Sequence, residues 1–220
     1  MKNNKILVCL LSVFMLITTT FITSAEPIDN SFYIEDTADF WIDPTYKMEL
    51  ENNSKRVRAA RTSTTLNISR LTQYDSRWAN DALNGCSGTT IKSSGCALVS
   101  MTMVYNYVKS KSVTPAYLNN NYVACPMNWN TFATNLGFSR VAYGSISSTN
   151  AYSTFKTYLD NGDPIVVQVK KGSNAHFMVV YGYNSSGKVL YVRDPDSTNF
   201  TTISASENSG WILTYYHVYS

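Results

Sequence analysis

The stretch SSGCALVSMTMVYNYV, residues 93–108, decides the fold class of this chain. From Cys96 onward, apolar residues recur at three- and four-residue spacing, which predicts a helix with one apolar face. Ser94 is its predicted N-cap, and Gly95 lets the backbone turn sharply before it. Cys96 thus lies in the first turn, where the helix dipole and free backbone N–H groups favour thiolate over thiol. That position suits a nucleophile, although cysteines at helix starts often serve packing alone.

Helices and strands occupy different parts of the chain after this stretch. Three further helices are predicted, at residues 115–121, 130–136 and 151–159. Thr114 as cap and Pro115 at the first helical position mark the start of the first of these. Short β-rich runs follow, at residues 164–169, 176–183, 188–193 and 211–217. Because Gly, Ser and Asn turns separate the first three runs as in an antiparallel meander, the pattern predicts an α+β fold.

Composition and charge divide the chain into three regions. The 220 residues are 44% apolar and 15% charged with a net charge of +3, which is typical of a globular protein. Residues 1–25 carry two lysines and no acids, residues 26–66 eight acids and five bases, and residues 67–220 seven acids and eleven bases. The excess of four positive charges in the last region is scattered, so nucleic-acid binding is not predicted.

Residues 1–25 have the pattern of a secretory signal peptide. Lys2 and Lys5 precede an almost unbroken apolar run at residues 6–17, and a Thr-rich stretch leads to Ala25. The pattern predicts cleavage after Ala25. The alternative, an uncleaved membrane anchor, needs roughly 20 apolar residues and the run is shorter. We therefore expect a secreted or cell-surface protein that makes no membrane contact after cleavage.

Residues 26–66 are expected to be a poorly ordered pro-segment or linker ahead of a domain at residues 67–220. The segment mixes acids with aromatic residues and ends in a basic run at residues 55–61. Exposed basic runs are sites where processing proteases cut. One hypothesis is a cleavable pro-segment whose aromatic side chains plug a cleft, and the other is a solvated linker.

Signal removal leaves an odd number of cysteines. Cys9 departs with residues 1–25, while Cys86, Cys96 and Cys125 remain. In an exported protein this count predicts either one disulfide and one free thiol or a set of separate thiols.

A base for the thiol must come from one of two histidines. His176 opens one predicted strand and Asp194 closes the next, so the hairpin between them brings the two close together. Asp194 is predicted to accept a hydrogen bond from His176 Nδ1, leaving Nε2 to face the thiol. The alternative for Asp194 is an ordinary Asp-Pro turn. His217 has no carboxylate nearby in the sequence and is interpreted as structural.

Three motifs occur in a fixed order over about residues 68–200. They are Gln73 followed by Trp78, then residues 94–98 running into a helix, then residues 176–183 followed by residues 192–195. Together they resemble the exported branch of the double-glycine (bacteriocin-processing-like) peptidases, which are papain-like cysteine peptidases of bacteria. The resemblance implies a papain-like α+β fold. It also implies the site residues, with Cys96 as nucleophile, His176 as base, Asp194 as orienting residue and Gln73 as side-chain donor of the oxyanion hole.

The resemblance also sets the expected activity. With Cys96 as nucleophile, Cys86 and Cys125 remain as a possible disulfide. We expect a monomeric, exported thiol hydrolase, without cofactor or metal, that cleaves peptide or amide bonds through an acyl-enzyme. Its substrate would be a peptide or peptidoglycan-type molecule. Two alternatives stay open: a papain-like amidase or transferase on cell-wall peptides, and a non-catalytic binding module on the same fold.

Overall fold

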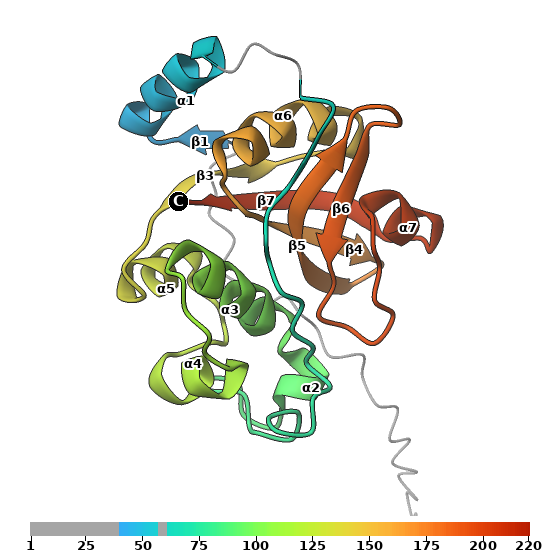
Figure 1. Cartoon of the computed structure of the whole chain (residues 1–220). Coiled ribbons are helices and arrows are strands. Elements are labelled where there is room, and N and C mark those ends of the chain that lie inside the picture. The colour runs from blue at the N-terminus through green and yellow to red at the C-terminus, as the bar shows by residue number, and fades with distance from the viewer. Residues whose placement is uncertain (1–39, 57–60) are drawn as a thin grey trace, which may run out of the picture.

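The computed structural model describes residues 40–56 and 61–220 (Figure 1). The predicted signal peptide and residues 26–39 lie outside these described residues. The helices are α1 (Pro44–Arg56), α2 (Ile91–Ser94), α3 (Cys96–Val108), α4 (Pro115–Asn121), α5 (Trp129–Asn135), α6 (Ser148–Asn161) and α7 (Ile203–Asn208). The strands are β1 (Phe40–Ile42), β2 (Ser63–Thr65), β3 (Arg140–Ser145), β4 (Ile165–Lys171), β5 (Asn174–Asn184), β6 (Val189–Arg193) and β7 (Ile212–Tyr219).

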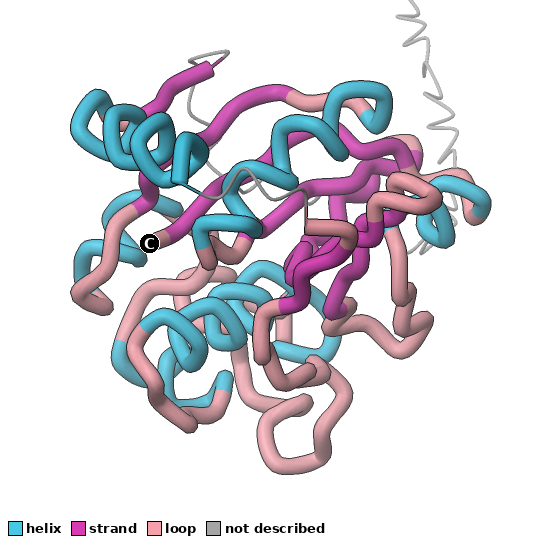
Figure 2. The backbone as a smooth tube through the Cα atoms, turned by 45° about the horizontal axis from the view of Figure 1, so that its top comes forward, coloured by secondary structure: helices cyan, strands magenta, loops and turns pink. Residues whose placement is uncertain are grey.

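Helices α2 to α5 gather on one side of the molecule and the strands on the other (Figures 1 and 2). All strand pairs are antiparallel, in the order β1-β3-β7-β4-β5-β2, with β6 also paired to β5. The predicted α+β architecture and the β4-β5-β6 meander are therefore confirmed. The last strand, β7, returns beside β4 and places β4 in the middle of the sheet, which explains why residues 165–169 are all buried.

The central helix α3 begins at Cys96, as predicted, but its cap differs from the prediction. Ser94 is the last residue of α2, and Gly95 is the N-cap of α3, without a side-chain hydrogen bond. Gly95 closes α2 through its N–H to Ile91 O and opens α3 by accepting from Val99 N. A Cβ on Gly95 would lie 2.4 Å from Ile91 O, so this junction requires glycine.

Burial of α3 is more complete than one apolar face. All residues from Cys96 to Val104 are buried, because β5 covers one side and other helices cover the rest. Ser100 Oγ donates to the backbone oxygen of Phe177 on β5 at 3.2 Å. The helix that carries Cys96 is thus fixed directly against the strand that carries His176.

The segment before the domain is partly folded, in contrast to the predicted poor order. β1 pairs with β3 and forms one edge of the sheet, and α1 packs on α6. Trp41 stacks on Tyr143 at 5.8 Å and Tyr46 on Tyr158 at 6.3 Å, so these two of the aromatic residues that suggested a plug attach the segment to the sheet and α6. Figure 1 shows α1 at the end of the molecule away from α2.

Within the described ranges, no helix has the length and apolar character needed to cross a membrane.

Candidate active site

The three cysteines of residues 61–220 divide as one thiol and one disulfide. Cys86 and Cys125 are joined, with a Cα–Cα distance of 5.4 Å, which confirms the pairing left open by the sequence. Cys96 keeps its thiol outside the disulfide and is buried at the first position of α3. Its backbone N–H belongs to the helix N-terminus, where the positive end of the dipole favours a negative charge.

His176 and Asp194 meet at the ends of neighbouring strands. His176 lies near the start of β5, and Asp194 directly follows β6. The distance from His176 Nε2 to Asp194 Oδ1 is 2.7 Å. The Asp194 carboxylate is fully buried and also accepts from the backbone N–H groups of Asp196 and Phe200 and from Thr198 Oγ1. These donors fix the carboxylate in one orientation before any ligand arrives.

The ring nitrogen that faces Asp194 is Nε2, whereas Nδ1 was predicted. Arg193 pairs with Val179, so Asp194 lies level with Met178, two residues from His176. From there the carboxylate meets the far nitrogen of the ring rather than the one next to the backbone. The Cys96 thiol also lies within hydrogen-bonding reach of the ring, and Nδ1 is the nitrogen left to face it.

The electrostatics favour a charged ring. Burial opposes the charge on His176, but the hydrogen bond with Asp194 and the contact with Cys96 outweigh burial and raise the pKa of His176 to about 10. Burial also opposes the charge on Asp194, which raises its pKa, but the hydrogen bond from His176 outweighs burial and leaves the pKa of Asp194 below its usual value. At neutral pH the pair is therefore an imidazolium and a carboxylate.

Gln73 lies at the same site and is held at both ends. Its backbone N–H donates to Pro195 O at 3.0 Å, and its side-chain Nε2 donates to Lys92 O at 2.6 Å. An amide nitrogen has two hydrogens, so one remains for a ligand. Its Oε1 is buried and accepts no hydrogen bond from the described part of the chain.

A cavity of about 210 Å³ joins these groups. Its lining includes three of the four predicted site residues, Gln73, Cys96 and His176, whereas Asp194 is buried behind His176 and does not line the cavity. The lining also includes Asp196 and Trp211, whose ring lies 5.8 Å from the His176 ring. No sequence signal marked Trp211, because only the return of β7 beside β4 brings it here.

The second histidine has a different environment. His217 is buried, stacks on Trp129 at 4.4 Å and lies 3.4 Å from Arg140 through Nδ1. Burial, and then the charge of Arg140, lower the pKa of His217 well below its usual value. A neutral ring packed in the core agrees with its interpretation as structural. Across residues 40–56 and 61–220, no group of three or more His, Cys, Asp or Glu side chains could hold a metal ion.

A protein-family model matches most of this chain. The model of the Peptidase_C39 like family matches residues 65–217, which is more than half of the chain. The match begins at the end of β2 and ends within β7, so it contains the whole cavity described above. No curated protein matches the chain.

Proposed function

Because the chain belongs to the Peptidase_C39 like family, we propose that it is a papain-like cysteine peptidase acting through Cys96, His176 and Asp194. One observation carries the proposal. His176 bonds to Asp194 at 2.7 Å through Nε2 and faces the Cys96 thiol with its other side, at the N-terminus of a buried helix. These are the contacts that a thiolate–imidazolium nucleophile needs.

The proposed reaction begins with the proton of Cys96 on His176 Nδ1. The thiolate attacks the carbonyl carbon of the scissile amide, and a carbon–sulfur bond forms as the carbonyl π electrons move to oxygen. His176 then gives its Nδ1 proton to the leaving amine, and the carbon–nitrogen bond breaks to leave an acyl-enzyme. Water attacks the acyl-enzyme after losing a proton to His176, and the carboxylic acid departs as the thiolate is restored.

Two donors are proposed to bind the oxyanion. They are the backbone N–H of Cys96 and the Nε2 hydrogen of Gln73 that is not used on Lys92 O. The bond to Lys92 fixes the amide before substrate binds, so little reorganisation is needed during the reaction. Removing such a donor costs about 3–4 kcal/mol in other enzymes. Gln73→Ala is accordingly expected to lower kcat by a factor on the order of 10² to 10³.

We further propose that the protein works outside the cytoplasm on peptide or peptidoglycan-type substrates. The pattern of residues 1–25 supports export. The Cys86–Cys125 disulfide supports it independently, because disulfides persist in oxidising compartments and are rare in the cytosol.

Acyl-enzyme trapping tests the proposed activity. The protein is incubated with a library of peptide thioesters, and its intact mass is followed in rapidly quenched samples. We expect a transient acyl adduct on Cys96, followed by hydrolysed product, and neither with Cys96→Ser. Glu49→Gln, an exposed change on α1, is the control and should behave as wild type. Turnover that survives in Cys96→Ser would contradict the proposal, and binding without any adduct would favour the non-catalytic module.

A further inference from the structure

Outside the proposed catalytic groups, the cavity beside Cys96 is lined by an acidic side chain and by no basic one in the described ranges. Apart from the proposed catalytic groups, the ionised side chain in its lining is the carboxylate of Asp196. Neither lysine nor arginine is among its lining residues in the described ranges. Phe200 and Trp211 add aromatic surface to the same walls. A carboxylate beside aromatic faces is a combination that attracts cationic groups, by charge and by cation–π attraction.

In the described part of the chain, no charged side chain forms an ion pair with the Asp196 carboxylate. Oδ1 accepts from Thr198 N at 3.0 Å and from Ser197 Oγ at 2.9 Å, and Oδ2 lies 3.5 Å from Tyr74 OH. All these partners are neutral. The ion pairs within residues 40–56 and 61–220 join other side chains, and none includes Asp196.

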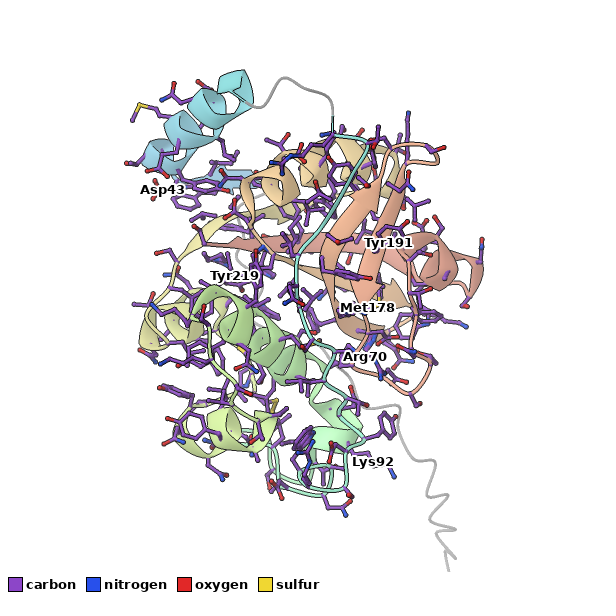
Figure 3. All side chains as sticks on the ribbon, in the orientation of Figure 1. Asp43, Arg70, Lys92, Met178, Tyr191 and Tyr219 are labelled. Atoms are coloured by element: carbon purple, nitrogen blue, oxygen red, sulfur yellow. A yellow bond between two sulfur atoms is a disulfide. The ribbon has the colours of Figure 1, made fainter. Side chains whose placement is uncertain are left out.

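Two cations near this turn, Arg70 and Lys92, contact groups other than the Asp196 carboxylate. The Arg70 guanidinium donates to the backbone oxygens of Asp194 and Asp196, at 2.6 Å each. Lys92 lies over the ring of Tyr74, with its Nζ 5.7 Å from the ring centroid. Figure 3 shows Arg70 near the ends of the strands and Lys92 on the helical side. Neither side chain forms a salt bridge with the Asp196 carboxylate.

The turn that carries Asp196 is held in place before a ligand binds. Besides the two bonds from Arg70, the backbone oxygen of Pro195 accepts from Thr72 Oγ1 at 2.9 Å and from the backbone N–H of Gln73 at 3.0 Å. The three consecutive carbonyls of residues 194–196 are therefore all bound to residues 70–73. A carboxylate on so well-fixed a backbone needs little ordering when it binds a partner.

We propose that Asp196 forms a subsite for a cationic group of the substrate, next to the amide bond that Cys96 attacks. The ligand class is a lysine or arginine side chain, or a free amine, within a peptide. This inference rests on the proposed function, because it assumes that the cavity receives substrate.

Three thiol reagents that differ in charge test the subsite without a known substrate. They are methanethiosulfonates carrying a trimethylammonium, a methyl or a sulfonate group, and each adds to Cys96 as a mixed disulfide with release of methanesulfinate. The rate of modification of Cys96 is measured by mass spectrometry at low ionic strength. In wild type the cationic reagent should react faster than the anionic one.

Two variants at Asp196 assign the charge preference to this residue. Asp196→Asn should lower the cation-to-anion rate ratio by about thirtyfold, because one unit charge at about 4 Å in water changes the rate of each reagent about fivefold, in opposite directions. Asp196→Glu should retain most of the wild-type ratio, and Glu49→Gln, which makes the same change in net charge on α1, should leave it unaltered. Added salt should reduce the preference in wild type. A ratio that is the same in Asp196→Asn and wild type overturns the subsite.

The neutral reagent separates this inference from the proposed function. Its rate reports the reactivity of Cys96 alone, since it carries no charge for Asp196 to attract. If that rate is ordinary for a thiol while the charge ratio still depends on Asp196, the catalytic proposal fails and the charged subsite remains. If Cys96 is highly reactive but the ratio is insensitive to Asp196, the subsite fails and the catalytic proposal remains.

Discussion

His176 connects the two parts of the proposed catalytic machinery, because one side of its ring meets Asp194 and the other faces Cys96. The pKa of about 10 depends on both neighbours. Asp194→Asn keeps a hydrogen-bond acceptor but removes a negative charge. Since that charge stabilises the imidazolium, the pKa of His176 should fall by about one to three units.

NMR titration of the imidazole signals measures this shift directly, since the chain has only two histidines. The ring of His176 in wild type should stay protonated through neutral pH and lose its proton near pH 10, and in Asp194→Asn it should do so at lower pH. His217, whose neighbours are Trp129 and Arg140, is the internal control and should not change. An unchanged midpoint for His176 would show that Asp194 does not support its charge.

For individual residues, the sequence predicted which side chains come together at the site but not how the ring of His176 is oriented. Cys96, His176 and Gln73 line one cavity as the motifs implied, and Asp194 contacts His176. The choice of ring nitrogen was wrong because it depends on the hairpin register, which includes a bulge between Val180 and Gly182. No local pattern gives the position of such a bulge.

Between structural elements, residues 70–73 hold the turn at residues 194–196 in place through hydrogen bonds to its backbone carbonyls. Arg70 bridges two carbonyls of that turn. Arg70→Ala should loosen the turn and so reduce the support that Asp194 gives His176. Arg70→Lys should recover little, because an ammonium lacks the planar fork that bridges two acceptors. We expect both variants to slow alkylation of Cys96 by iodoacetamide at neutral pH.

The matched control is Arg77→Ala, which removes an exposed guanidinium paired with Asp75. It should leave the alkylation rate unchanged. A double variant distinguishes an effect of Arg70 on the position of Asp194 from an effect on overall stability. In an Asp194→Asn background, Arg70→Ala should cause little further loss of the Cys96 alkylation rate. Full additivity of the two changes would contradict the idea that Arg70 acts through Asp194.

The Cys86–Cys125 disulfide connects the loop before α2 to the segment before α5, across a sequence separation of 39. In the chain-entropy model a loop of this length contributes about 4 kcal/mol to the free energy of unfolding. Replacing both cysteines by serine should lower the free energy of unfolding by about that amount, as measured by urea denaturation. Because Cys96 is not part of the bridge, its alkylation rate in the folded state should be retained, and its loss would tie the bridge to the site.

Local signals predicted some elements well and others not at all. Helix α4 begins as expected, with Thr114 Oγ1 accepting from Tyr117 N and Pro115 at the first position. Strand β3 was missed, since its alternation is weak and it is defined by pairing with β1 and β7. A helix cap depends on neighbouring residues and can be predicted from the sequence. Strand pairing joins residues far apart in the sequence, so no local pattern predicts it.

For the molecule as a whole, the described part of the N-terminal segment belongs to the folded structure. Tyr46 on α1 is buried and donates a hydrogen bond to Asp163, which Asn161 also contacts. Burial raises the pKa of Asp163, so this carboxylate depends on its donors. Tyr46→Phe should lower the free energy of unfolding by about 1–3 kcal/mol, the usual cost of leaving a buried polar group unsatisfied.

Urea denaturation checks this effect, with Tyr117→Phe as control because that ring is about half exposed. Equal stability of Tyr46→Phe and wild type would mean that α1 is not energetically coupled to the domain. The hypothesis of a plug in the cavity finds no support in residues 40–56, none of which lines it. Residues 26–39, on which the hypothesis also rests, lie outside the described part of the chain.

The most direct test of the whole account is the rate of Cys96 alkylation by iodoacetamide as a function of pH, in wild type and in His176→Ala. A thiolate held by His176 predicts rapid alkylation well below pH 8.5, where an ordinary thiol is protonated. His176→Ala should remove that advantage and return the profile to that of an ordinary cysteine. Identical profiles in the two proteins, both rising near pH 8.5, would contradict the thiolate–imidazolium pair on which the proposed function depends.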